Sequence, residues 1–223
     1  MKRFLDLSLS LIAIILLFPC LLPIIIILKF TGEGFVFYKQ PRVGKDEKVF
    51  YLYKFATMFK NSPNMKGGNI TSKSDPRVLP FGKILRKYKL NELPQIINVL
   101  KGDMSIIGRR PTVREHFDFY DLEVKSTISK LKPGLSGVSS IVFRDEENYF
   151  IENSPEKNKL IYQNKIAPFK GELEMWYSRN QSFITDLFLI FITIISIVRP
   201  ASNLHNIIFK DLPKHPLFNP LIN

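Results

Sequence analysis

The chain has 223 residues, 45% of them hydrophobic, and its 32 lysines and arginines against 20 acidic residues give a net charge of +12. This length accommodates one medium domain with a membrane element, and the hydrophobic content excludes a disordered chain. The charge calls for an anionic partner such as nucleic acid, anionic lipid or a diphosphate, and the single cysteine excludes an internal disulfide.

The N-terminal segment is predicted to enter a membrane. Residues 7–28 carry no charged side chain, and as a straight helix they would reach about 33 Å, enough to cross a bilayer core. Pro19 and Pro23 predict a bend in the middle of this run. Basic residues flank both ends, which favours placing both ends in the cytoplasm. We therefore expect a re-entrant helix over residues 1–30, with a kinked single span as the alternative.

The next part of the chain has the pattern of a β-hairpin followed by a loop and two helices. Residues 35–38 and 49–53 are β-prone and flank a polar turn, and residues 61–74 form a polar segment that predicts a mobile loop. Apolar residues then recur at helical spacing from Phe81 to Tyr88, opposite a basic face. Such a helix lies either on a membrane surface or on a protein core. A second apolar stripe over residues 93–100 stops at Gly102, a helix-ending signal.

The remainder of the chain is predicted to be mainly helical. Residues 132–137 (KPGLSG) indicate a turn, and residues 144–174 indicate helix and loop. Phe183–Val198 is apolar but short for a membrane span and contains Asp186, so we expect an interfacial or core helix. Residues 199–223 contain several prolines and are expected to be an irregular tail. The predicted fold is α+β, with a small β-hairpin and a mainly helical cytosolic domain over residues 31–198.

Two short segments carry candidate site residues. In the run Asn91-Glu92-Leu93-Pro94, Asn91 is a favoured helix N-cap, and the N–H groups of a helix N-terminus attract phosphate. Glu92 beside such a phosphate could hold Mg²⁺, which takes one or two carboxylates plus substrate oxygens. Arg109 and Arg110 are adjacent guanidinium groups suited to phosphate contact, although solvated surface arginines are the simpler interpretation.

Ordered motifs along nearly the whole chain carry a resemblance to a known family. They include the run KFATM at residues 54–58, the segment KLNELPQIINVLKGDMSIIGRRP at residues 89–111, and the KPGLSG run. This set is similar to that of the bacterial sugar transferases, the monotopic polyprenyl-phosphate phosphoglycosyl transferases. The resemblance implies a membrane enzyme with a proline-broken re-entrant helix and interfacial amphipathic helices.

The resemblance also implies a reaction. A phospho-sugar passes from a UDP-sugar to undecaprenyl phosphate, with release of UMP, at the cytoplasmic face of the bacterial inner membrane, as the first membrane step of glycan biosynthesis. The implied partners are the two substrates and anionic membrane lipids. The implied cofactor is Mg²⁺. Nucleic acid is not expected, because the chain has no nucleic-acid motif and carries the membrane run. The oligomeric state stays open, with a homodimer among the options.

The resemblance assigns roles to several residues of this chain. Glu92 matches the second member of the family's Asp-Glu pair and its Mg²⁺ site, and Arg110 matches an arginine near the substrate phosphates. We expect Lys54, Arg77 and Arg86 to contact phosphate as well.

Asn91 stands where the family has its nucleophilic Asp, and Ala56 and Arg109 are further departures. An amide is neutral, a poor nucleophile and a weak metal ligand. We therefore expect an enzyme with an altered mechanism, in which Asn91 positions the diphosphate and Glu92 holds Mg²⁺ while the lipid phosphate attacks directly. The alternative is an inactive membrane-bound member that binds a lipid phosphate or a partner protein.

Overall fold

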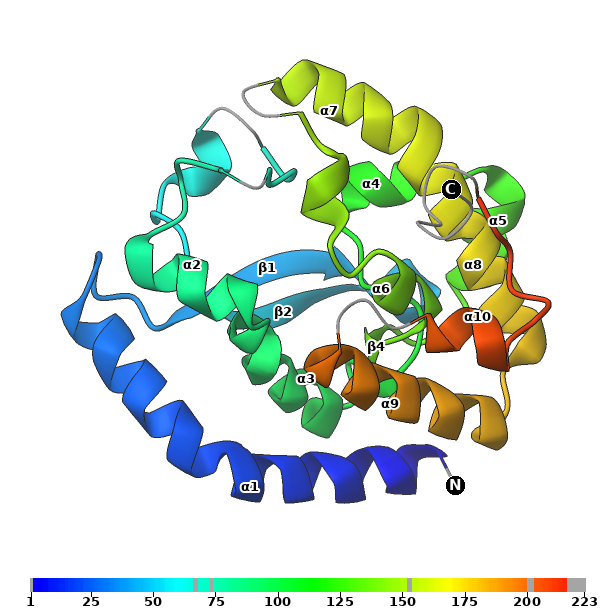
Figure 1. Ribbon diagram of the computed structural model, residues 1–223, viewed down its shortest axis with the longest axis horizontal. Helices are drawn as coiled ribbons and strands as arrows, with labels where there is room; N and C mark the ends of the chain where they lie inside the picture. Colours follow the sequence, from blue (N-terminus) through cyan, green and yellow to red (C-terminus); the bar gives the residue numbers. More distant parts are fainter. Residues whose placement is uncertain (1, 66–67, 73, 152–153, 200–202, 216–223) are drawn as a thin grey trace.

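The structure is a computed structural model that describes residues 2–65, 68–72, 74–151, 154–199 and 203–215. Helices dominate, and the strands are short (Figure 1). The helices are α1 (Lys2–Phe30), α2 (Pro80–Lys87), α3 (Ile96–Lys101), α4 (Arg114–Asp118), α5 (Leu122–Ile128), α6 (Val138–Val142), α7 (Pro155–Ile161), α8 (Ala167–Asn180), α9 (Phe183–Val198) and α10 (Leu204–Ile208). The strands are β1 (Phe37–Val43), β2 (Val49–Phe55), β3 (Ser105–Ile107) and β4 (Gly134–Ser136). Shorter turns are η1 (Lys45–Glu47), η2 (Ser62–Asn64), η3 (Leu90–Gln95), η4 (Glu146–Tyr149) and the π-helical η5 (Tyr162–Ile166). The molecule therefore mixes helices with two small sheets, as the sequence predicts.

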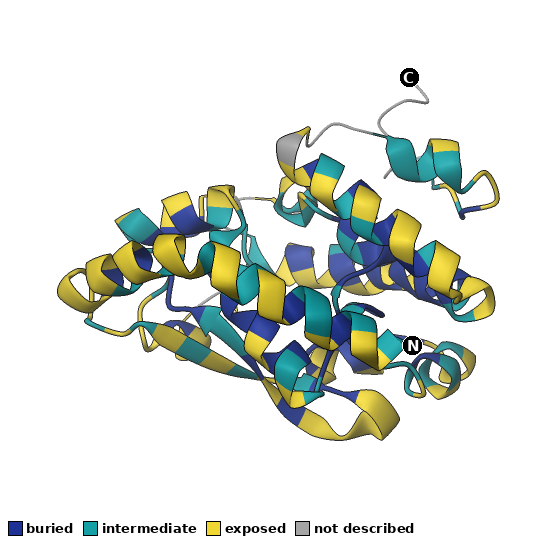
Figure 2. Cartoon of the chain, turned by 90° about the horizontal axis from the view of Figure 1, so that it is seen from below, coloured by how far each residue is buried: buried dark blue, intermediate teal, exposed yellow. Residues whose placement is uncertain are grey.

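The first helix is long, apolar and bent. α1 contains both Pro19 and Pro23 without breaking into two helices, and it changes direction in its middle as it passes along the body (Figure 1). Within the described ranges it is the one helix long and apolar enough to cross a membrane. Exposed residues recur along its outer face (Figure 2). Proline removes one helical hydrogen bond and crowds the preceding turn, which accounts for a bend without an end to the helix.

The N-terminal end of α1 is fixed to the body by three charged side chains, which we call the N-terminal clamp. Lys2 Nζ lies 2.5 Å from an Asp186 carboxylate oxygen on α9. Arg3 donates to two backbone carbonyls at the end of α3, at 2.6 and 2.8 Å. Asp6 accepts hydrogen bonds from the Ser105 hydroxyl and the Ile106 amide, each at 2.9 Å. These contacts fix the start of the helix against α3, β3 and α9.

The other end of α1 packs on the same body. Ile24 and Leu28 are buried in a small cluster with Phe55 of β2 and Leu85 of α2. Both ends of the bent helix therefore contact one globular domain, while the outer side chains of its middle remain exposed.

The predicted hairpin is present, with a longer first strand. β1 and β2 pair antiparallel, with Phe37 opposite Phe55 and Val43 opposite Val49. The sequence placed the first strand at residues 35–38, whereas it continues through Pro41 to Val43. A proline is tolerated there because this sheet has only two strands, so each has a free edge.

The KPGLSG run at residues 132–137 is not simply a turn. Gly134–Ser136 forms β4, which pairs in parallel with β3. An added Cβ at Gly134 would lie 2.1 Å from the Gly108 nitrogen, and one at Gly137 would lie 2.0 Å from the Gly108 oxygen. The glycines are therefore needed because two backbones approach closely, which a single sequence does not distinguish from a turn.

The two predicted helical stripes are present on α2 and on the η3–α3 segment. Leu85 is buried, whereas Ile84 and Tyr88 remain exposed, so α2 packs on the core with one face and leaves apolar side chains on another. Gly102 follows α3 with φ of 90°, the left-handed conformation that ends many helices. In the 61–74 loop, the described residues contain only the short η2; residues 66–67 and 73 lie outside the described part.

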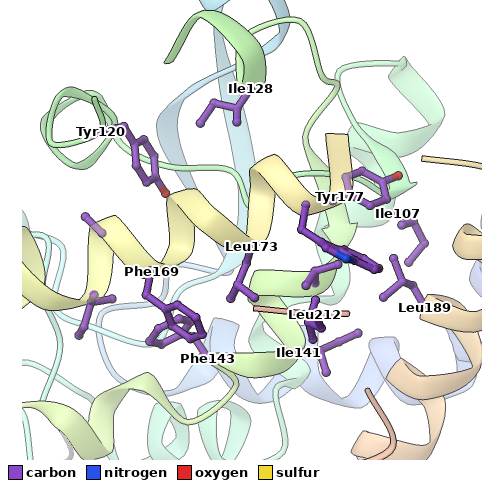
Figure 3. Close-up of a cluster of buried hydrophobic side chains, with 14 of the residues drawn as sticks. Ile107, Tyr120, Ile128, Ile141, Phe143, Phe169, Leu173, Tyr177, Leu189 and Leu212 are labelled. Carbon is purple, nitrogen blue, oxygen red and sulfur yellow. The ribbon is translucent and has the colours of Figure 1, made fainter. Parts of the chain in front are cut away.

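The main core lies around α8. Phe169, Leu173 and Tyr177 of this helix are buried with Phe143 and Leu189 (Figure 3). The expected irregular tail is partly helical, because α10 begins at Leu204. Side chains that follow α10 pack on the Trp176 ring, and Leu212 is buried. Residues 200–202 and 216–223 lie outside the described residues.

Candidate functional site

A cavity of about 720 Å³ lies where the hairpin, α2, η3 and η4 meet. Basic side chains outnumber acidic ones around it, so we call it the cationic cavity. Its charged lining residues are Arg42, Lys54, Lys60, Arg77, Arg86, Lys89, Arg110, Arg144, Lys170, Glu33, Glu92, Glu146 and Glu147. The wall beside α1 is apolar and includes Leu28, Phe55 and Phe81. The cavity can therefore receive an anion next to an apolar chain.

Glu92 and Lys54 form a pair in this cavity. Lys54 Nζ lies 3.4 Å from Glu92 Oε1, and the two side chains are 21% and 38% exposed. Burial by itself would raise the pKa of Glu92, but the positive charges of Lys54, Arg110 and Lys89 outweigh it and lower that pKa to about 2. Burial lowers the pKa of Lys54 to about 8, with repulsion from neighbouring arginines adding to it. Glu92 is therefore a stable carboxylate at neutral pH and not a proton donor.

Asn91 lies beside this pair but does not cap a helix. Lys89 precedes η3 in a left-handed conformation, with φ of 56°, and Asn91 is already inside the turn. The predicted N-cap role is therefore wrong. Asn91 is 6% exposed and lines the cavity, and its Oδ1 accepts no hydrogen bond from a described residue. A buried carbonyl oxygen without a donor is costly, so a ligand atom that pairs with it would be favoured.

Arg110 and Arg86 are the predicted phosphate ligands with donors to spare. Arg110 donates one hydrogen bond, to the Ser140 hydroxyl at 3.3 Å, and lies 3.7 Å from Glu146. Burial alone would lower the pKa of Arg110. The negative charges of Glu146 and Glu92 raise it by more than burial lowers it, so the net shift is upward. The Arg86 guanidinium donates no hydrogen bond to a described residue, and burial lowers the pKa of Arg86. Both guanidinium groups can therefore contact an anion.

Arg77 does not fit its predicted role. Its guanidinium donates to the Asp75 carboxylate and to the backbone carbonyls of Ser62, Gly68 and Ile70. All five N–H donors of this arginine are used, and the side chain is 2% exposed. Arg77 therefore holds the preceding loop in place, and a phosphate contact would require it to release that loop.

The adjacent pair Arg109 and Arg110 is split by the fold. Arg109 is fully buried, donates to the carbonyls of Val43 and Gly44 at 2.9 Å, and lies over the Phe117 ring. Only Arg110 faces the cavity. The idea that both guanidinium groups contact phosphate is therefore wrong, because neighbouring residues here point to opposite sides of the chain.

Several charged or titratable side chains of the cavity were not predicted from the sequence, among them Arg42, Lys170, Glu146 and His116. Arg42 donates to the Pro111 carbonyl at 3.0 Å, and burial lowers its pKa to about 10. Lys170 and Glu146 pair at 2.7 Å, and His116 stacks on Tyr162. They come from β1, α8, η4 and α4 and meet only in the folded chain. The one sequence signal was a lysine between apolar residues of α8, which is easily taken for a solvated position.

The residues present fit a divalent cation only together with a substrate. Among the described residues, no group of three carboxylate, histidine or cysteine side chains could hold a metal ion alone. Glu92 offers one carboxylate, and the adjacent residue Asn91 offers an unpaired amide oxygen, Oδ1. Mg²⁺ commonly uses one or two protein oxygens and completes its shell with phosphate and water. The surrounding cations oppose a metal ion until an anion neutralises them.

The chain is similar to a family of known proteins. The family model described as "Bacterial sugar transferase" matches residues 1–200. The chain is 34% identical, over 88% of its length, to the UDP-N-acetylgalactosamine-undecaprenyl-phosphate N-acetylgalactosaminephosphotransferase of Aeromonas hydrophila. It is 30% identical over 86% of its length to the exopolysaccharide production protein ExoY of Sinorhizobium fredii. It is 32% identical over 87% of its length to the UDP-glucose:undecaprenyl-phosphate glucose-1-phosphate transferase of Escherichia coli. The match spans 83% of ExoY, but only 43% and 39% of the Aeromonas and Escherichia proteins.

Proposed function

Because the chain belongs to the bacterial sugar transferase family, we propose that it transfers a sugar 1-phosphate from a UDP-sugar to undecaprenyl phosphate and releases UMP. The observation that carries the proposal is the cationic cavity, where Lys54, Arg86 and Arg110 surround Glu92 beside an apolar wall formed with α1. A water-soluble diphosphate and a lipid phosphate both need positive charge, and the lipid also needs an apolar approach. This transfer would begin the synthesis of a bacterial glycan at the membrane.

The proposed step is a direct displacement. A phosphate oxygen of undecaprenyl phosphate attacks the phosphorus that bears the sugar, and a new P–O bond forms. The bond from that phosphorus to the oxygen of UMP breaks, and UMP leaves with the electron pair. Arg110 and Lys54 stabilise the negative charge on the reacting phosphates, since fixed donors in a cavity require little reorganisation. Asn91 orients the diphosphate in place of the family's nucleophilic Asp.

Mg²⁺ is the proposed cofactor, held by Glu92 with Asn91 Oδ1 nearby. When bound with the diphosphate, the ion would neutralise part of its negative charge. Glu92 suits this role because its lowered pKa keeps it ionised at every physiological pH.

We also propose that the protein is monotopic, at the cytoplasmic face of the bacterial inner membrane, with α1 re-entering on the side from which it came. The contacts of Lys2 and Arg3 at one end and of Leu28 at the other, all with one domain, support this topology. The exposed apolar side chains of α9 support an interfacial position for that helix.

A UMP-release assay tests the activity. Purified protein is mixed with a panel of UDP-sugars, undecaprenyl phosphate and Mg²⁺, and we expect release only when all three are present. Glu92→Ala should lower the rate by about 100-fold or more, whereas Glu156→Ala, which removes an exposed carboxylate on α7, should not. Exchange of labelled UMP into the UDP-sugar without the lipid acceptor would contradict direct displacement, because it reports a covalent intermediate.

The second candidate is a non-catalytic membrane subunit that binds a lipid phosphate or a partner enzyme. It is favoured by Asn91, whose amide cannot act as the nucleophile. The substitution Asn91→Asp distinguishes the two candidates. It replaces the amide by a carboxylate of nearly the same size, among the cations of the cavity. UMP release that appears only in Asn91→Asp supports the subunit, whereas release by the unaltered protein supports the enzyme.

A further inference from the structure

A second ion pair lies in the cationic cavity, between η4 and α8. Lys170 Nζ on α8 donates to Glu146 Oε1 on η4 at 2.7 Å. The lysine side chain is 1% exposed and the glutamate 16%. The ammonium group lies between the Phe143 and Tyr162 rings, 5.0 and 4.8 Å from their centroids. An ammonium group that is so fully enclosed has little freedom to move, so the Glu146 carboxylate that it binds is also fixed in place.

The fixed carboxylate faces Arg110. Glu146 Oε2 lies 3.7 Å from Arg110 Nη2, and Ser140 Oγ accepts from Nη1 at 3.3 Å. The backbone amide of Arg110 donates to Glu174 at 2.8 Å. Arg110 is thus held on three sides and still retains donors for a ligand, in contrast to Arg77. The charges of Glu146 and Glu92 both raise the pKa of Arg110, so two carboxylates stabilise the guanidinium in its charged form.

We propose that Lys170 and Glu146 are positioning residues, which hold the Arg110 guanidinium where it can bind the diphosphate of the donor. The inference rests on the proposed function, because it assigns residues to the same substrate. Lys170 is needed because Glu146 alone would form a closer pair with Arg110. When Lys170 is present, the Glu146 carboxylate interacts with both Lys170 and Arg110. Glu146 Oε2 then stays 3.7 Å from Arg110 Nη2, and the guanidinium remains free to bind phosphate.

The expected effects follow from this division of charge. In Lys170→Met, Glu146 has only Arg110 as a partner and competes with the ligand for its donors. In Glu146→Gln, Arg110 loses its lateral restraint and Lys170 loses its counter-charge. Each change removes a charged hydrogen bond, and we expect each to weaken UDP binding about tenfold. In the double variant the competing carboxylate is absent, so the combined loss should be smaller than the sum of the two.

The test measures UDP affinity by calorimetry, and KM and kcat for UMP release, on the full chain in detergent. KM should rise about tenfold in Lys170→Met with a smaller change in kcat, because the interaction orients a binding group. Lys170→Arg should restore much of the affinity. The matched control is Lys159→Met, which breaks the Lys159–Glu115 pair of 2.8 Å outside the cavity. UDP affinity should stay unchanged in this control.

Unchanged UDP affinity in both Lys170→Met and Glu146→Gln would overturn the proposal, as would an equal loss in the Lys159→Met control. If Lys170→Met does not fold, Glu146→Gln decides, since it preserves the size of the side chain. A protein that binds UDP with the expected pattern of losses but releases no UMP would sink the proposed function and leave the positioning role supported. Normal UMP release with no effect of either variant on UDP affinity would support the proposed function and overturn the positioning role.

Discussion

At the scale of single residues, His116 is a base that the fold keeps neutral. It is 8% exposed, and its ring stacks on Tyr162 with centroids 4.0 Å apart. Burial lowers the pKa of His116 to about 4, and the nearby charge of Lys170 adds to the effect. A proton on this imidazole would be both desolvated and repelled, so protonation favours the unfolded chain.

This residue predicts an acid-dependent loss of stability. The unfolded histidine titrates near pH 6.5 and the folded one near pH 4, so the unfolded state binds more protons between these values. The stabilising contribution is therefore complete above pH 6.5 and is lost as the pH falls toward 4. We expect the free energy of unfolding to drop by about 2 kcal/mol between pH 6.5 and 4.5 on account of His116 alone. Denaturant titrations of the wild type and His116→Gln measure it; equal pH dependence in the two would contradict the prediction.

The arginines illustrate which part of the site a sequence can specify. Arg110 was assigned from the family motif, and it lies in the cavity beside Glu92. Arg77 and Arg109 were equally good candidates by residue type, yet one binds a loop and the other binds the β1–β2 turn region. The difference depends on which carbonyls the folded chain brings within reach. For Arg109, nothing in the local sequence indicates its partners, because Val43 lies 66 residues away.

At the scale of elements, the spacing of apolar residues predicted α2 and the η3–α3 segment, and an apolar run predicted α9. α9 was predicted as Phe183–Val198 and is found with those bounds. The pairing of β3 with β4 could not be foreseen, since each strand has three residues and their contact depends on glycine backbones meeting at Gly108. The charges that η4 and α8 contribute to the cavity were not predicted either, because they come from a part of the chain in which the sequence analysis found no site residue.

The bent α1 predicts that both of its ends are accessible from one side of the membrane. A protease-cleavable epitope is joined before the chain, and Thr31→Cys is introduced after Cys20→Ser removes the one native thiol. In inside-out vesicles we expect protease to remove the epitope and an impermeant maleimide to label residue 31. The physical reason is that Lys2 and Arg3 bind the domain that also carries the far end of the helix. An epitope protected in these vesicles but cleaved in spheroplasts would indicate a straight span.

At the scale of the whole molecule, exposed apolar surface and positive charge occur together. Large apolar side chains remain exposed on α1, α2 and α9, and the net charge is +12. Soluble proteins rarely leave so much apolar surface uncovered. The net charge alone would also fit a nucleic-acid-binding protein, so an experiment must distinguish binding to a membrane from binding to nucleic acid.

Salt separates the two kinds of binding. We expect the full chain to float with vesicles containing anionic lipid at physiological salt and to remain with them at about 1 M salt, because burial of apolar surface is not screened. A labelled DNA duplex in the same mixture should stay unbound at physiological salt, and any weak retention at lower salt should disappear as salt rises. Tight DNA binding in the presence of vesicles would contradict the membrane assignment.

The N-terminal clamp has a consequence for how the protein is made. Lys2 and Arg3 leave the ribosome well before their partners, which are supplied by residues 99, 100, 177 and 186. The contacts of Arg3 with residues 99 and 100 can therefore form first, whereas the ion pair of Lys2 must wait until Asp186, 184 residues further along the chain, has been synthesised. A stalled product that ends before α9 would lack the Lys2–Asp186 ion pair and would hold the start of α1 through Arg3 and Asp6.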